Sequence, residues 1–170
     1  MISILLKYFL GFIGLFLLQV LILNYVSLFD GWAQPYIYFY PLLTLPFVIP
    51  KKVLLLIGFA TGLSIDIFTN TPGIHASATL TLAFLRPTVL KYVSPRDDFE
   101  ASAPSIKNMG IKFISYSGVL VLAHHLWLFM LLYFSSGLVF SSIGHALASS
   151  VFSMIFIILL QLFSNDKKTY

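Results

Sequence analysis

The sequence predicts an all-α membrane protein with six transmembrane helices in a single domain of residues 1–170, and three observations lead to this prediction. The chain is 59% hydrophobic and only 9% charged, whereas soluble domains carry about 25% charged residues. Six apolar runs each approach the roughly 20 residues that a membrane-spanning helix needs. Apart from Arg86, every Lys and Arg falls at a terminus or beside the second or fourth link between these runs.

The first expected helix covers about Tyr8–Val26 and carries the polar residues Gln19 and Asn24. A basic residue precedes it, as in a signal peptide. However, the apolar run exceeds a signal core of about 7–15 residues and no small-residue cleavage site follows, so we expect a retained span. The second helix is expected at about Trp32–Ile49. Its three prolines are expected to kink it rather than end it.

The third and fourth helices, at about Val53–Phe68 and Gly73–Val93, are expected to form a hairpin joined by the short sequence TNTPG. A set of small or polar residues repeats every four positions on each helix, so each set shares one helix face. These sets are Gly58, Gly62 and Asp66 on the third helix and His75, Thr79 and Ala83 on the fourth. The two glycines form a G-x-x-x-G pair, which allows close helix approach in lipid. The two faces should therefore pack on each other or on a third helix.

The fifth and sixth helices are expected at about Phe113–Phe134 and Val139–Phe163. Between the hairpin and the fifth helix lies the hydrophilic stretch Ser94–Lys112. Its mixed charge and two prolines predict a loosely ordered surface segment. The sixth helix carries a narrow polar stripe at four-residue spacing, formed by Ser141, His145, Ser149 and Ser153.

The basic residues predict the orientation of the helices. They fall on one side of a six-span arrangement, at Lys7, Lys51, Lys52, Lys91, Arg96, Lys107, Lys112, Lys167 and Lys168. The positive-inside rule then places both termini in the cytoplasm. Because the net charge of +4 follows this topology, it gives no reason to expect a nucleic-acid partner.

Polar residues within the spans gather at similar depth. Asp66 follows Lys52 by 14 residues, which puts it about 21 Å above the inner surface. His75, His124 and His145 fall at comparable height in the outer half of a core about 30 Å thick. Arg86 lies deeper and is expected to snorkel to the inner interface rather than pair with Asp66.

Several roles stay open for these polar residues. Gly58, Gly62, Asp66, His75, Arg86 and Pro87 are candidates for helix packing or partner binding, Pro87 because it frees a backbone carbonyl. Asp66, His75, His124 and His145 are candidates for a pocket that holds a ligand or a partner's helix. Scattered ligands disfavour a metal site. The sequence has no cysteine and shows no catalytic or phosphate-binding motif, so we expect neither enzymatic activity nor a cofactor.

The hairpin sequence resembles the MreD family, the small membrane subunit of the bacterial rod-shape machinery. The matching features are a glycine-rich helix with G-L-x-x-D-x-F, a loop with G-x-H-A and a closing A-F-L-R-P. Upstream, Gln19, Asn24, Leu28-Phe29, Pro35 and Pro46 also fit the family. The resemblance covers about Gln19–Val93, whereas the last two spans match only in number and length.

The resemblance implies a six-helix protein of the bacterial inner membrane without enzymatic activity of its own. It implies partnership with MreC, which has one span and a periplasmic domain, and through MreC with MreB filaments, the RodA glycosyltransferase and its penicillin-binding transpeptidase. Contact is expected within the bilayer, through the second span and the hairpin. The family is also similar to the substrate-binding subunits of energy-coupling-factor vitamin transporters, so a solute-binding transport subunit is the alternative.

Overall fold

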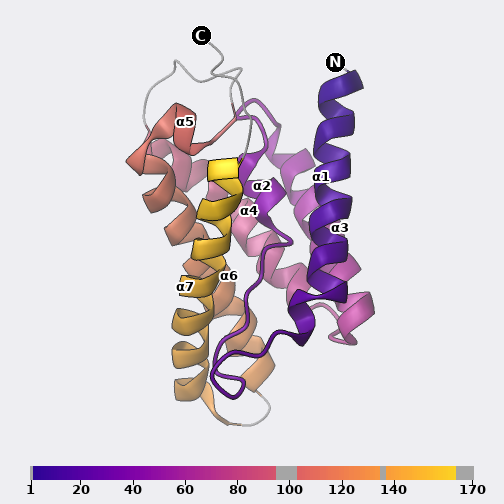
Figure 1. The fold of residues 1–170 in the computed structure, drawn as a ribbon, viewed down its shortest axis with the longest axis vertical. Helices are drawn as coiled ribbons and strands as arrows, with labels where there is room; N and C mark the ends of the chain where they lie inside the picture. The colour runs from indigo at the N-terminus through magenta and orange to yellow at the C-terminus, as the bar shows by residue number, and fades with distance from the viewer. Residues whose placement is uncertain (1, 95–102, 135–136, 164–170) are drawn as a thin grey trace.

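The computed structural model describes residues 2–94, 103–134 and 137–163. These residues form an all-helical structure in which an isolated bridge between Leu28 and Ala33 is the only β-type pairing described. The long helices are α1 (Ile2–Leu21), α3 (Lys51–Thr69), α4 (Ile74–Val93), α6 (Ile111–Phe134) and α7 (Val139–Phe163) (Figure 1). The short ones are η1 (Leu23–Tyr25), α2 (Tyr40–Thr44) and α5 (Ile106–Met109).

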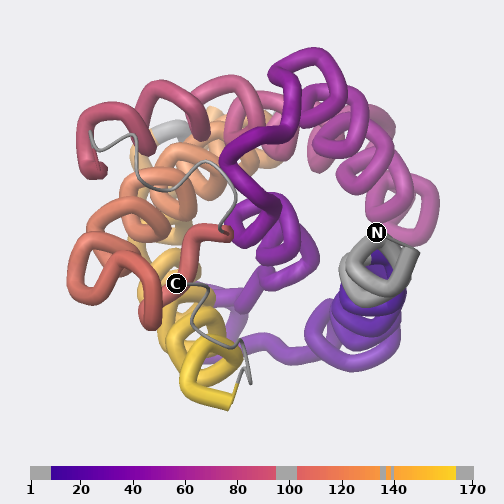
Figure 2. The backbone as a smooth tube through the Cα atoms, turned by 90° about the horizontal axis from the view of Figure 1, so that it is seen from above, coloured from indigo at the N-terminus to yellow at the C-terminus, as the bar shows by residue number. Residues whose placement is uncertain are grey.

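The long helices run side by side along the long axis of the molecule (Figure 1). Helix α3 packs on α4, α4 on α6, and α6 on α7. Seen from above, the long helices surround the short helix α2, and α1 lies next to α3 (Figure 2). Helix α1 begins and α7 ends at the same end of the molecule. The interior of the bundle contains α2 and the chain on either side of it, most of which is not helical.

Within the described residues, three helices are long and apolar enough to cross a membrane, namely Lys51–Thr69, Ile111–Phe134 and Phe140–Phe163. Their outward faces carry large apolar side chains, such as Leu56 and Ile67 of α3, which are 68% and 72% exposed. Such faces suit lipid rather than water. The chain is a membrane protein, and the predicted all-α class is confirmed. Helices α1 and α4 have 20 residues each, but polar residues make α4 less apolar than its neighbours.

The prediction of a second membrane helix at Trp32–Ile49 is wrong. In this region, which we call the central segment (residues 32–49), only the five residues of α2 are α-helical. The reason is the spacing of Pro35, Pro41 and Pro46, because each proline lacks a backbone N–H and biases the residue before it away from helix. Tyr36–Phe39 are four consecutive buried residues, none more than 4% exposed. Protein therefore surrounds the middle of the central segment, whereas Trp32 and Val48 near its ends are 52% and 70% exposed.

Other boundaries also differ from expectation. Helix α1 ends at Leu21 instead of Val26, and α6 begins at Ile111. The described part of Ser94–Lys112 is packed rather than loose, since Ser105 and Met109 are 2% and 7% exposed. The Ile106 amide donates to Gln161 Oε1 of α7 at 3.0 Å. The predicted cytoplasmic residues Arg96, Lys167 and Lys168 lie outside the described residues.

Candidate functional site

The glycine face of α3 lies directly against α4. A Cβ atom built on Gly58 would come within 2.9 Å of Ala83 Cβ, and one built on Gly62 would come within 2.5 Å of Ala76 Cα. Carbon atoms avoid such distances because dispersion contacts are optimal at about 3.5–4.0 Å. The two glycines are therefore what lets α3 and α4 approach closely.

Asp66 joins the two helices of the hairpin at its closed end. The carboxylate is 3% exposed and accepts hydrogen bonds from the backbone amides of His75 (2.9 Å) and Ala76 (2.9 Å), and from Thr71 Oγ1 (2.9 Å). These amides belong to the first turn of α4, where N–H groups have no partner within the helix. A carboxylate is also stabilised there by the helix dipole. Asp66 of α3 thus caps α4 across the hairpin loop.

The same contacts orient the ring of His75. Its Nδ1 lies 3.1 Å from Asp66 Oδ1 and 2.9 Å from Thr71 Oγ1. The Thr71 hydroxyl gives its single hydrogen to Asp66 Oδ1, so in the contact between Thr71 Oγ1 and Nδ1 the ring nitrogen carries the hydrogen and acts as the donor. In the neutral ring, Nε2 is then left as a hydrogen-bond acceptor. The ring is held in one tautomer and one direction.

Arg86 does not snorkel to the interface as predicted, although it also does not pair with Asp66. It is 2% exposed and reaches into the protein from α4. Its Nε donates to Tyr116 Oη at 3.0 Å, and its Nη2 donates to the carbonyl of Leu45. Tyr116 Oη in turn donates to the Leu43 carbonyl at 2.9 Å. Because α2 ends at Thr44, these carbonyls lack partners within the helix. The Arg86 guanidinium donates to Leu45, and the Tyr116 hydroxyl donates to Leu43.

The polar stripe of α7 binds one edge of the central segment. Three contacts form in register: His145 Nδ1 to Trp32 O at 3.0 Å, Gln34 N to Ser149 Oγ at 3.0 Å, and Tyr36 N to Ser153 Oγ at 2.9 Å. Alternate residues of an extended chain are about 6.6 Å apart, and residues four apart on a helix are about 6.0 Å apart. The two spacings nearly match, so a helix stripe can pair with every second residue of an extended chain.

Gln19 of α1 binds the opposite edge of the same segment. Its Nε2 donates to the Pro35 carbonyl at 3.2 Å, and its Oε1 accepts from the Ile37 amide at 2.9 Å. Gln19 is completely buried. From Trp32 to Ile37, the backbone groups of the even-numbered residues thus bond to α7, and those of Pro35 and Ile37 bond to α1. The same alternation of backbone groups occurs in a β-strand. Non-helical backbone at membrane depth needs such internal partners, and here side chains replace the neighbouring strands.

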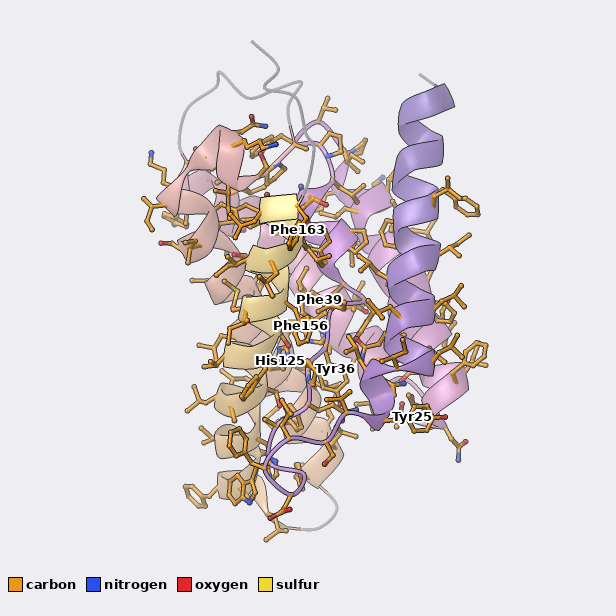
Figure 3. All side chains as sticks on the ribbon, viewed as in Figure 1. Tyr25, Tyr36, Phe39, His125, Phe156 and Phe163 are labelled. Atoms are coloured by element: carbon orange, nitrogen blue, oxygen red, sulfur yellow. The ribbon has the colours of Figure 1, made fainter. Side chains whose placement is uncertain are left out.

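Histidines and aromatic rings fill the space around the central segment. Tyr36, Phe39 and His125 lie together in the interior (Figure 3). His125 bonds the Val121 carbonyl at 2.8 Å and Ser153 Oγ at 3.1 Å. His124 Nε2 pairs with Tyr38 Oη at 2.9 Å, whereas its Nδ1 has no partner among the described residues. His145 lies nearer the start of α7. Its ring stacks on those of Trp32 and Tyr133, with centroid distances of 4.6 Å and 4.8 Å.

Of the four residues predicted to form a pocket, His75 alone lines the cavity at the closed end of the hairpin. This cavity has a volume of about 550 Å³, and we call it the hairpin pocket. Its lining is Val20, Leu21, Asn24, Tyr25, Gln34, Tyr36, Phe68, Thr69, Thr71, His75 and Leu132. Asp66 lies behind His75, while His124 and His145 have the separate partners given above. Within the described part of the chain, no group of His, Asp or Glu side chains is arranged to hold a metal ion.

Sequence reasoning missed the partners of these groups. Gln19 and the serines of α7 were noted as polar, but their targets on the central segment were not, and the contacts of Tyr38 and Tyr116 were not foreseen. One signal was available. Three prolines within a run expected to cross the membrane leave backbone groups unpaired, and buried polar side chains at matching depth are their natural partners.

Comparison of the chain with family models, with curated proteins and with solved structures gives no match. The placement of the side chains is therefore what bears on function. Most of the buried polar groups described above bond to one another or to the backbone. The hairpin pocket differs because part of its polar lining faces open space.

Proposed function

We propose that this chain is an MreD-type scaffold of the bacterial inner membrane, which helps to organise lateral peptidoglycan synthesis without catalysing a reaction. One observation supports this most. The residues that carry the family resemblance are the ones that build the α3–α4 hairpin: Gly62 provides close packing, and Asp66 and His75 close the loop. Polar groups used in this way shape a membrane surface rather than attack a substrate.

The proposed topology has six crossings and cytoplasmic termini. Five are the long helices, and the sixth is the central segment, which returns the chain between α1 and α3. Lys51 begins α3 and Lys91 lies in the last turn of α4. Because α3 and α4 are antiparallel, both lie at the end where α1 begins (Figure 1). This distribution agrees with the positive-inside rule.

The proposed partner is an MreC-like protein with a single span, which would connect the chain indirectly to MreB filaments, RodA and its transpeptidase. The middle of the central segment is buried and so offers no lipid-facing surface to this partner. A groove of about 670 Å³ between α1 and α3 does, and the end of the central segment contributes Leu45, Pro46 and Ile49 to its lining. The hydroxyls that line it, Thr61 and Ser64, bond to their own helix at 2.8 Å each. The occupant of the groove is therefore apolar, as one transmembrane helix would be.

Depletion of the protein in its host tests the proposed function. We expect rounded or widened cells, and we expect the protein to co-purify with a single-span partner in mild detergent. Ala60→Trp fills the groove and should abolish co-purification. Ile67→Trp is the matched control, because Ile67 lies on the same helix, faces outward and does not line the groove. Normal cell shape after depletion would contradict the proposal.

The hairpin pocket favours a second candidate, the substrate-binding subunit of a vitamin-type transporter. Its volume of about 550 Å³ lies within the roughly 300–1,000 Å³ of small-molecule sites. This candidate predicts a small molecule that co-purifies with the protein and an energy-coupling partner in place of a single-span one. Mass spectrometry of the proteins that co-purify in mild detergent separates the two candidates, because a single-span partner supports the scaffold and an energy-coupling partner supports the transport subunit.

A further inference from the structure

We infer that the hairpin pocket binds an uncharged small molecule that donates a hydrogen bond to Nε2 of His75. The inference rests on the pocket alone and does not depend on which of the two functions is correct. It assigns a specific role to His75, which the hairpin contacts explain only in part. Asp66 and Thr71 account for one nitrogen of the ring, and the other nitrogen is available to a ligand.

The geometry of His75 carries this inference. The residue is 3% exposed, and its Nδ1 is fixed as a donor by Asp66 and Thr71. The described residues provide no partner for Nε2, and the ring forms part of the pocket wall. Nε2 opens on the pocket rather than on protein, so its hydrogen-bond partner is water or a bound molecule. An acceptor held in one direction at a cavity wall suits a ligand that donates.

Hydrogen bonds also fix the orientation of other polar side chains in the wall of the hairpin pocket. Gln34 Nε2 donates to the Asn24 carbonyl at 3.1 Å, and Tyr36 Oη donates to Gln34 Oε1 at 2.9 Å. Asn24 Oδ1 accepts from Gln19 at 2.9 Å, so the Asn24 amide presents its two Nδ2 hydrogens. The wall thus offers a fixed acceptor at His75 and fixed donors at Asn24. A ligand with both hydroxyl or amide N–H groups and an acceptor oxygen would satisfy both.

The wall also limits the charge of the ligand. Its described lining contains no Lys, Arg, Asp or Glu, so a bound ion would lose hydration without a counter-charge at the wall, which is costly. An anion is disfavoured further, because Nε2 presents a lone pair and the Asp66 carboxylate lies behind the ring. Leu21, Phe68 and Leu132 provide apolar contact on the remaining sides. These features select a neutral molecule with polar and apolar parts.

Two amides that differ in a single donor test the inference. N-methylacetamide has an N–H group, whereas N,N-dimethylacetamide has none. The full chain, labelled with ¹⁵N-histidine in lipid nanodiscs, is titrated with each amide and with acetate, and the Nε2 resonance of His75 is followed by NMR. We expect a saturable shift with N-methylacetamide, and about tenfold weaker binding of the dimethyl compound, the size expected for one lost hydrogen bond. Acetate should leave the resonance unchanged.

A pair of variants shows whether the shift reports on the hairpin pocket. Leu132→Trp fills the pocket and should abolish the shift while the other histidine resonances stay in place. Leu131→Trp adds the same ring one position away, at a residue that does not line the pocket, and should preserve the shift. The inference is overturned if no probe shifts the resonance, if both amides bind equally, if acetate binds, or if Leu132→Trp still responds.

Discussion

The α3–α4 hairpin and the central segment run through the same bundle, but their backbone hydrogen bonds are satisfied in opposite ways. In the hairpin, the backbone satisfies its own hydrogen bonds within each helix, and the side chains determine how closely the helices pack. In the central segment, the backbone has few internal partners, and side chains of α1, α4, α6 and α7 provide them. Gln19, Ser149 and Ser153 bind its extended part. Arg86 and Tyr116 bind the carbonyls around the end of α2.

This difference predicts which substitutions should be damaging in the hairpin and which in the central segment. A hairpin helix keeps its backbone hydrogen bonds with any side chain other than proline, so it is sensitive mainly to added volume on its glycine face and to loss of its cap. The central segment is sensitive to the loss of single polar atoms on other helices, because each leaves a buried backbone group without a partner. The predictions below test this contrast.

The largest effect should come from adding volume to the hairpin. Replacing both Gly58 and Gly62 by Leu would force α3 and α4 apart, because a single Cβ already collides with α4. We expect loss of folded protein, measured as the monodisperse fraction in detergent. Gly118→Ala is the matched control in α6, where an added Cβ meets nothing within 4 Å. It should be neutral or stabilising. A double variant that folds and melts like the parent would refute the packing of these faces.

Loss of the hairpin cap should have the next largest effect. Asp66→Leu leaves the amides of His75 and Ala76 and the hydroxyl of Thr71 without their acceptor, which should cost about 3 kcal/mol or more. Asp66→Asn keeps one oxygen and should cost about half as much. Unfolding in mixed micelles measures both. Equal damage from the two variants would show that the negative charge itself is required.

The central segment should respond strongly to a change on α1. Gln19→Leu removes the partners of the Pro35 carbonyl and the Ile37 amide and should lower the free energy of unfolding by about 2–3 kcal/mol. Ser64→Ala is a suitable control, because this hydroxyl bonds only to the Ala60 carbonyl of its own helix. Similar stability of the two variants would mean that Gln19 does not hold the central segment.

Two serines of α7 provide a finer comparison. Ser149→Ala leaves the Gln34 amide unpaired and should cost about 1–2 kcal/mol. Ser150→Ala, also on α7, removes a hydroxyl that donates to the Ala146 carbonyl and leaves no amide unpaired. It should be nearly neutral. If both changes cost the same, the polar stripe has no specific role in pairing with the central segment.

The smallest effect should be the coupling between Tyr38 and His124. Either Tyr38→Phe or His124→Leu breaks their 2.9 Å contact, and each should be destabilising by about 1 kcal/mol. The double variant removes both polar partners, so it should cost clearly less than the sum of the two single changes. A double-mutant cycle of unfolding free energies measures this coupling, and strict additivity would contradict the contact.

The hairpin could be predicted from sequence and the central segment could not, for a physical reason. The spacing of Gly58, Gly62 and Asp66 along one helix is a local property, so it predicted which face of α3 packs on another helix, while α4 and a third helix both stayed open as the partner. Whether three prolines kink a helix or replace it depends on partners elsewhere in the chain, such as Gln19 and Ser153, and local patterns do not contain that information. Arg86 shows the same limit, because its partners are carbonyls that only a broken helix exposes.

The most direct test of this account is the backbone conformation of the central segment in a lipid bilayer. Solid-state NMR of the ¹³C-labelled chain measures the Cα and Cβ chemical shifts of Gln34, Tyr36 and Ile37, and these report local backbone geometry residue by residue. The account predicts shifts typical of extended chain for all three, next to helical shifts throughout α3. Helical shifts that continue from Trp32 to Ile49 would contradict it, because that stretch would then be an ordinary membrane helix with no need of Gln19, Ser149 or Ser153.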